Sequence, residues 1–312
     1  MVGRLADSVE EVIRGCSAYV DFEESIEQLS GRIRASSRLS PEIYCIYFDL
    51  LQAISRDDLD ESLRLLREMD IRIEAPLLSL YSRWGALPAS TAHRYLTYVN
   101  VDPETNVNFK ALDSRDFDEI RRCADSAFGL LKHSAPEIAA EIQSLVTEIV
   151  FVSGAPNEPL QFSGATSFFC WGALFLNADK HRDLVAMIDG LTHESAHAYL
   201  FSLSLGASFV DNPDDELHPS PLRVDPRPLD GIFHATYVSA RMHYAHNHVL
   251  ESGMLSKSEE CGARDALAAS YTAFWDGLKT VEDHASLTPL GRQVMGAARS
   301  YMVGQPNVAI DL

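Results

Sequence analysis

The N-terminal part of the chain carries apolar side chains at helical spacing. Between residues 6 and 72 the apolar positions recur every three or four residues, a period that predicts helices. One such stripe comprises Leu59, Leu63, Leu66 and Met69. Ser40 stands directly before Pro41, and this pair is typical of a helix start, with the serine as cap and the proline in the first turn.

After residue 100 the spacing of the apolar residues along the chain changes. The segment around Asp102 and Pro103 favours a turn, and residues 115–147 return to helical spacing. Residues 148–154 and 167–178 are rich in branched and aromatic side chains, so they predict strands, the second segment forming one strand or two. Further helices are predicted over residues 183–205, 231–252 and 259–278, and from Thr288-Pro289 to about residue 302.

These elements predict an α+β fold that is predominantly helical. The small sheet comes directly before the helix of residues 183–205, an order that suits a zincin-like scaffold in which a strand edge borders the site. A boundary near residue 100 would separate an N-terminal helical region, residues 1–100, from a domain of residues 101–312 that holds the candidate catalytic residues. A single domain also agrees with the pattern.

Composition and charge narrow the class of partner. The 312 residues are 46% hydrophobic and 23% charged, which is typical of a globular protein. No stretch approaches the roughly 18 apolar residues of a membrane span, and the N-terminus lacks the apolar core of a secretory signal. The formal net charge of −19 argues against nucleic acid and anionic membranes, because both attract basic patches. A basic peptide segment is compatible with it.

The cysteines favour a reducing compartment. The chain has five, scattered and without a CxxC pair: Cys16, Cys45, Cys123, Cys170 and Cys261. This pattern predicts neither a disulfide framework nor a cysteine zinc site, and it indicates a cytoplasmic protein.

The sequence HESAH, within a predicted helix, carries the strongest chemical signal. His193 and His197 lie one turn apart and about 40° apart around the helix axis, so both imidazoles can reach one ion. Glu194 can touch a ligand of that ion without binding the metal. Gly190 and Ala186 lie on the histidine side, where small residues would leave room for an ion and a substrate.

A catalytic metal needs a third protein ligand, and two residues are candidates. Glu216 lies nineteen residues after His197, the spacing of the aminopeptidase-type zinc enzymes, but it stands in an acidic, proline-bounded stretch that is a poor helix. His234 lies on the helix predicted over residues 231–252 and is the favoured ligand. Three further histidines on that helix are spaced like a solvent-facing cluster: His243, His246 and His248.

The segment SPLRVDPRPLDG, between the two helices, combines three prolines with Arg223 and Arg227. The prolines make it semi-rigid, and a guanidinium binds a carboxylate in bidentate fashion. Two interpretations stay open. The arginines bind a carboxylate ligand, or Arg223 pairs with Asp225 and only shapes the loop.

The motif HESAH followed by SPLRVDPRPLDGIFHATYV resembles the HExxH-motif peptide-modification proteins found in biosynthetic clusters for ribosomally made peptides. The resemblance covers roughly residues 145–250 and includes the upstream segment SFFCWGALFLNA. The combined pattern of HExxH and SPxRxDPRPxxGxxH is far more specific than HExxH alone. One departure is Leu217-His218-Pro219, where the family pattern favours aromatic residues.

Characterised members of that family are iron(II)- and 2-oxoglutarate-dependent β-hydroxylases of peptide residues. The resemblance therefore implies that His193, His197 and His234 bind iron, and that the partner is a precursor peptide. Under this hypothesis Glu194 orients a ligand or a supporting group, because a hydroxylase needs no base to activate water.

The same resemblance implies that an arginine anchors the distal carboxylate of 2-oxoglutarate. Arg227 is the preferred anchor and Arg223 the next, while Arg241 on the following helix is a third possibility.

Two other classes of function stay open. In a zinc metallopeptidase Glu194 would be the general base, with Tyr237 or His234 assisting, and Glu216 would restore a ligand set of two histidines and a carboxylate. In a non-catalytic peptide-binding protein the same site would be vestigial. For the N-terminal helical region, the hypothesis is that it shapes a peptide groove or binds a leader segment.

Overall fold

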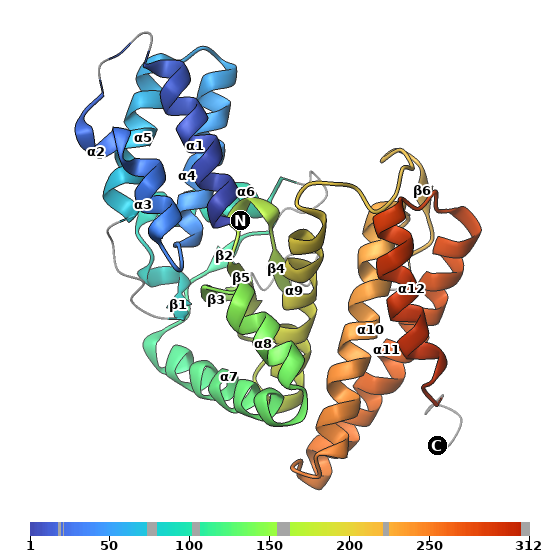
Figure 1. Cartoon of the computed structure of the whole chain (residues 1–312). Helices are drawn as coiled ribbons and strands as arrows, with labels where there is room; N and C mark the ends of the chain where they lie inside the picture. The colour runs from blue at the N-terminus through green and yellow to red at the C-terminus, as the bar shows by residue number, and fades with distance from the viewer. Residues whose placement is uncertain are drawn as a thin grey trace. The chain divides into compact units, whose positions relative to one another are not determined.

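The computed structural model describes residues 1–17, 20, 22–73, 80–101, 107–154, 163–220 and 225–306 (Figure 1). Contacts divide the chain into two units. Unit 1 comprises Met1–Asp113 and Val146–Asn177, and unit 2 comprises Ser114–Leu145 and Ala178–Leu312. The units therefore interleave along the sequence, and the predicted domains of residues 1–100 and 101–312 stay a prediction.

Unit 1 begins with helices, as the apolar spacing predicted. They are α1 (Val2–Cys16), α2 (Glu24–Glu27), α3 (Leu29–Ala35), α4 (Pro41–Ser55), α5 (Leu59–Ile73) and α6 (Ala89–Val99), with a 3₁₀ turn at Trp84–Ala86. The predicted start of α4 is confirmed, because the Ser40 hydroxyl accepts a hydrogen bond from the backbone N–H of Glu42 and Pro41 occupies the first turn.

The sheet of unit 1 is small and mixed. Its strands are β1 (Tyr81–Arg83), β2 (Phe109–Lys110), β3 (Glu148–Gly154), β4 (Gly164–Thr166) and β5 (Ala173–Asn177). Their order is β1-β3-β5-β4, with β1, β3 and β5 parallel, β4 antiparallel to β5, and β2 antiparallel to the end of β3. β5 is buried along its whole length, which explains its continuous apolar sequence.

Two segments of this region, residues 148–154 and 167–178, were predicted as strands. Residues 148–154 form β3 as predicted, but the segment 167–178 contains only one strand, because Phe168–Cys170 forms a 3₁₀ turn that precedes β5. Ser167 caps this turn by accepting a hydrogen bond from the N–H of Phe169. The turn predicted at Asp102 and Pro103 lies outside the described residues.

Unit 2 is helical apart from one short hairpin. Its elements are α7 (Ser114–Ser134), α8 (Pro136–Leu145), α9 (Leu184–Ser204), β6 (Leu217–His218), β7 (Arg227–Pro228), α10 (Leu229–Glu251), α11 (Lys257–His284) and α12 (Pro289–Val303). In Figure 1, α10 and α11 run alongside each other, and α12 packs against α10. The fold is therefore predominantly helical with a small mixed sheet, as expected for an α+β protein.

The helix that carries HESAH is buried on more than one face. Met187, Leu191 and Glu194 are buried on one face, and Ala196 and Leu200 are buried on the opposite face. The Asp183 side chain caps its first turn by accepting a hydrogen bond from the N–H of Ala186. The helix ends at Ser204, one residue before the predicted end, and Leu205 and Gly206 both have positive φ.

In the part of the chain that the structure describes, no helix combines the length and the apolar character that crossing a membrane requires.

The start of α12 depends on a glycine. A Cβ built on Gly291 would lie 2.1 Å from the backbone oxygen of Phe209, which cannot retreat as a flexible side chain could. We expect Gly291→Ala to lower the free energy of unfolding by about 2 kcal/mol or more. Gly296→Ala is the control in the same helix, because its Cβ would meet nothing within 4 Å. It should stabilise by about 0.5–1 kcal/mol. Urea unfolding followed by circular dichroism measures both, and equal effects would contradict the packing argument.

Candidate metal centre

The helices α9 and α10 bring three histidines together. His193 and His197 project from successive turns of α9, and His234 lies near the start of α10. His197 is the central member. Its Nε2 lies 3.3 Å from Nε2 of His193, and its Nδ1 lies 3.3 Å from Nδ1 of His234. The structure therefore brings the three predicted ligands into contact, and that they bind a metal stays a prediction.

The two contacts of His197 have different chemical meanings. Two nitrogens bound to one ion at about 2.0–2.1 Å stand about 3.0–3.4 Å apart, so Nε2 of His193 and Nε2 of His197 have the spacing of a ligand pair. His234 lies at the opposite nitrogen of His197. From there Nδ1–H of His197 can donate a hydrogen bond to Nδ1 of His234, which fixes the tautomer of His197 and leaves its Nε2 lone pair available.

As the side chains lie, therefore, the three histidines do not converge on one point. Within the described ranges, no set of three or more histidine, cysteine, aspartate and glutamate side chains has an arrangement that would hold an ion. His234 would reach an ion held by the other two only after its side chain turned. Its Nε2 lies 4.0 Å from a carboxylate oxygen of Asp230.

Burial keeps the imidazoles of His197 and His234 neutral. Desolvation lowers the pKa of His197 well below its usual value, and the neighbouring His193 and His234 lower it further. Desolvation also lowers the pKa of His234, although the carboxylate of Asp230 opposes the shift. Neutral imidazoles are the form that binds metal, so these two side chains need not lose a proton before they bind a cation.

Aromatic rings enclose His234. The rings of Phe201 and Phe209 each lie 5.7 Å from it, measured between centroids, and Phe209 stacks on Phe233 at 4.8 Å. The backbone oxygen of Phe209 accepts a hydrogen bond of 3.0 Å from the N–H of Thr288, the N-cap residue of α12. The packing of α12 thus restricts the ring of His234.

Glu194 and Tyr237 are both buried. Glu194 is 4% exposed, and its position on α9 places it one residue after His193. Desolvation raises the pKa of Tyr237, so its hydroxyl keeps its proton at neutral pH. Tyr237 lies one turn after His234 on α10, and the charges of Arg241 and Glu141 act on it.

The three candidate arginines have different surroundings. Arg227, in β7, forms an ion pair with Asp225 at 2.7 Å and is only 14% exposed. Arg241 forms an ion pair with Glu141 of α8 and lies over the rings of Tyr199 and Tyr244. Arg223 lies outside the described residues. Asp225 thus pairs with Arg227, and the pairing considered for Arg223 and Asp225 stays a prediction.

Glu216 belongs to a different cluster. It precedes β6 and is exposed, and its carboxylate accepts hydrogen bonds from the amide of Asn212 at 3.1 Å and from Nε2 of His218 at 3.0 Å. These contacts lower its pKa. His218 in turn stacks on His284. The structure therefore pairs Glu216 with these neighbours, and as a third ligand it would have to leave them.

The space beside Gly190 is occupied. The sequence predicted room here for an ion and a substrate, but a Cβ on Gly190 would lie 2.7 Å from the ring of His181. His181 is 4% exposed, and among the described residues neither ring nitrogen has a hydrogen-bond partner. Desolvation lowers its pKa to about 4, which keeps it neutral. The prediction of empty space was wrong because a histidine from the preceding loop fills it.

Two histidines of α10 were also misjudged from their spacing. His243 and His246 were predicted to face solvent, yet they are 1% and 0% exposed. His243 Nδ1 lies 2.9 Å from the hydroxyl of Tyr301, and His246 Nε2 lies 2.9 Å from a carboxylate oxygen of Asp189. The sequence contains no local signal for these partners, because they come from other helices.

Comparison of the chain with protein-family models and with curated proteins finds no match.

The contact between Gly190 and His181 can be tested by a double-mutant cycle. We expect Gly190→Ala to lower the free energy of unfolding by about 1–3 kcal/mol, because the new methyl group overlaps a buried ring. In a His181→Ala background the same substitution should be neutral or stabilising, since the methyl group then enters vacated space. Denaturant unfolding of the four proteins measures this coupling. Simple additivity of the two substitutions would contradict the contact.

His243 should make stability depend on pH. Burial lowers its folded pKa to about 4, whereas an unfolded histidine titrates near 6.5. The unfolded state then binds more protons between these values, so this contribution is intact above about pH 6.5 and is lost as the pH falls toward 4. His243→Gln should reduce the slope of unfolding free energy against pH by up to about 1.4 kcal/mol per pH unit. His133→Gln, at an exposed position of α7, is the control, and identical slopes for the two variants would refute the assignment.

Proposed function

We propose that this protein is an iron(II)- and 2-oxoglutarate-dependent hydroxylase that modifies the β-carbon of a residue in a ribosomally made precursor peptide. The main support is the contact of His197 with both His193 and His234, which joins HESAH to the histidine of the SPxRxDPRPxxGxxH segment. A zincin-like arrangement and a cytoplasmic location belong to the same proposal.

The donor set suits iron. Imidazole nitrogen is a common ligand of iron(II) and zinc, and these imidazoles are neutral because burial lowers the pKa of His197 and His234. His193 and His197 would hold the metal through Nε2. His234 would be the third ligand after its side chain turns, or it would support His197 at Nδ1. Bound iron would supply the redox chemistry by which oxygen and 2-oxoglutarate hydroxylate an unactivated carbon.

Among the arginines, Arg227 remains the preferred anchor for the distal carboxylate of 2-oxoglutarate. It stands at the start of α10, two turns before His234, and its present partner Asp225 is half exposed. A carboxylate ligand could therefore replace Asp225 with little loss. Arg241 is less suited, because its ion pair with Glu141 is partly buried and breaking it would leave a charge without a partner.

Glu194 would orient a group bound at the metal or a neighbouring side chain. Its carboxylate is buried beside His193 and can accept a hydrogen bond from a group bound at the metal or from a neighbouring side chain. Tyr237, which keeps its proton, can donate a hydrogen bond to the bound peptide or to 2-oxoglutarate.

A zinc peptidase is the second candidate. The observation in its favour is the buried carboxylate of Glu194 beside the ligand pair His193 and His197, the place of the general base in HExxH enzymes. Tyr237 would then assist at the developing oxyanion. A peptide-binding protein without activity would need none of these groups, which makes it the weakest of the three.

The decisive experiment is anaerobic reconstitution with iron(II), followed by 2-oxoglutarate and an absorption spectrum. We expect a visible charge-transfer band from the iron chelate and, once oxygen and a peptide substrate are added, a peptide product that gains one oxygen atom. His193→Ala should abolish the band, because it removes half of the ligand pair. His133→Ala, at an exposed site, should leave it unchanged. Stoichiometric zinc, no band and cleavage of a peptide would overturn the hydroxylase in favour of the peptidase.

Two variants of His234, tested in the same assay, distinguish its two proposed roles. If His234 binds the metal, both His234→Ala and His234→Gln lose the band. If it supports His197 through Nδ1, the glutamine variant retains it, with iron affinity reduced by about 10- to 100-fold in the alanine variant.

A further inference from the structure

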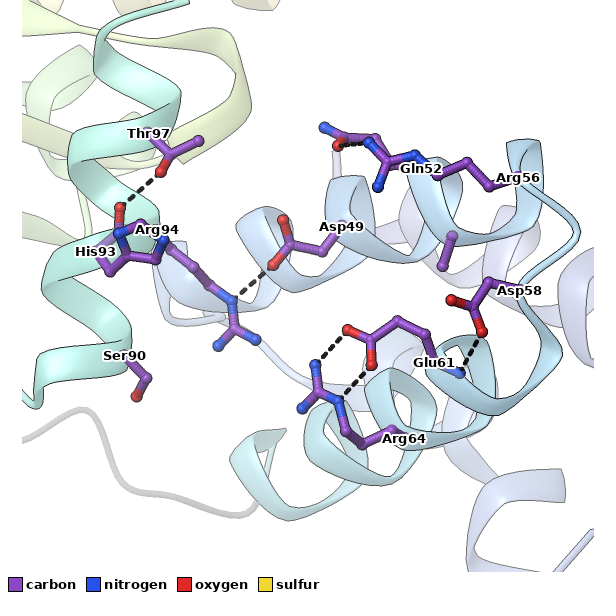
Figure 2. A pocket seen from close by; sticks show the side chains of 11 residues that line it. Asp49, Gln52, Arg56, Asp58, Glu61, Arg64, Ser90, His93, Arg94 and Thr97 are labelled. Atoms are coloured by element: carbon purple, nitrogen blue, oxygen red, sulfur yellow. Dashed lines mark hydrogen bonds and ion pairs between the residues drawn. The ribbon is translucent and has the colours of Figure 1, made fainter.

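Unit 1 contains a cavity that the histidine site does not use. It measures about 350 Å³, and its walls come from α4, the α4–α5 turn, α5 and α6 (Figure 2). The lining residues that matter for charge are Asp49, Arg56, Asp58, Glu61, Arg64, His93 and Arg94. A volume of this size falls in the range of small-molecule and short-peptide sites, roughly 300–1,000 Å³.

Most of these charges are already paired, which makes the walls rigid. Arg94 binds Asp49 at 2.7 Å and holds both carboxylate oxygens of Glu68, at 2.5 and 2.7 Å. Arg64 forms a bidentate pair with Glu61, with both distances at 2.6 Å. Bidentate pairs fix orientation as well as charge, so the cavity is preformed.

Arg56 and Asp58 are the exceptions, because neither forms an ion pair with a described residue, and the Asp58 carboxylate only accepts a hydrogen bond from the backbone N–H of Glu61. Arg56 is exposed at the end of α4, and within the described residues its guanidinium forms no ion pair and only a 3.5 Å contact with the side-chain oxygen of Gln52. On the other side of the cavity, the ring of His93 on α6 makes no hydrogen bond to any described residue. Figure 2 shows these two groups on opposite walls, with Arg94 between them.

The chemistry of the lining selects the ligand. A guanidinium without an acid partner binds a carboxylate or a phosphate. The fixed carboxylates of Asp49, Asp58 and Glu61 line the same space, and they repel a phosphate dianion more strongly than a carboxylate monoanion. A single carboxylate at Arg56 therefore suits the site. The separation of Arg56 from His93 favours an extended ligand whose backbone reaches the His93 wall.

We propose that this cavity binds an extended peptide segment through one acidic side chain, whose carboxylate pairs with Arg56 while His93 hydrogen-bonds the peptide backbone. This inference does not depend on the hydroxylase proposal, because binding at unit 1 needs neither the metal nor 2-oxoglutarate.

The test uses the full chain and an acetylated, amidated pentapeptide, Gly-Ser-Glu-Ser-Gly, with its glutamine counterpart. Calorimetry gives the dissociation constant, and the arginine Nε–H resonance of Arg56 reports the place of binding. We expect the glutamate peptide to bind about tenfold or more tightly than the glutamine peptide, as for a hydrogen bond between charged groups. Arg56→Gln should remove that preference. Arg14→Gln, an exposed arginine on α1, is the matched control and should keep it.

Two further ligands and one further variant in the same assay identify the source of the carboxylate. Glutarate that bound as tightly as the peptide would overturn the peptide assignment in favour of a free small acid, and tighter binding of inorganic phosphate would overturn carboxylate selectivity. His93→Ala should weaken both peptides by a similar factor, because it contacts their common backbone. An unmoved Arg56 resonance, or an Arg56→Gln variant that still prefers glutamate, would refute the proposal.

Discussion

The antiparallel pairing of α9 with α10 is the constraint on which unit 2 depends. Two polar contacts fix it: His197 meets His234, and Asp189 meets His246. Asp189 lies eight residues before His197 on α9, and His246 lies twelve residues after His234 on α10. At 1.5 Å per residue these separations are about 12 and 18 Å. Two anchors this far apart allow neither helix to slide by a turn without losing both. The contact of Asp189 with His246 therefore helps to fix the register of α9 and α10 at the candidate metal centre, although it takes no part in the chemistry of that centre.

The sequence anticipated the parts of this arrangement that are local. The spacing of His193 and His197, the caps at Ser40 and Thr288, and the buried strand at Ala173–Asn177 follow from residues within one or two turns. Apart from the approach of His234 to His197, the sequence did not anticipate contacts between distant elements. His243 and His246 have polar spacing but are buried, because partners 58 and 57 residues away satisfy one nitrogen of each ring. Burial of a histidine is decided by such partners, and periodicity carries no information about them.

The environment of Gly190 illustrates the same limit at the candidate site. A small residue beside two candidate ligands is compatible with a vacancy for substrate, yet it is equally compatible with a close neighbour, and His181 is that neighbour. A buried imidazole with lowered pKa contributes bulk and a possible hydrogen bond but no charge. The carboxylate of Asp230 on α10 lies 4.0 Å from Nε2 of His234. A negative charge at this place favours a cation nearby.

Net charge was a poor guide to how the individual sites would select their ligands. The chain carries a formal charge of −19, which on its own favours a basic partner. Charges farther apart than about 8–10 Å are largely screened at physiological ionic strength, so a ligand within a cavity responds mainly to the groups that line it. Around the cavity of unit 1 three carboxylates, those of Asp49, Asp58 and Glu61, face the guanidiniums of Arg56, Arg64 and Arg94, so the formal charges of the lining balance. An acidic side chain that paired with Arg56 would therefore meet a balanced lining and not the surplus negative charge of the whole chain.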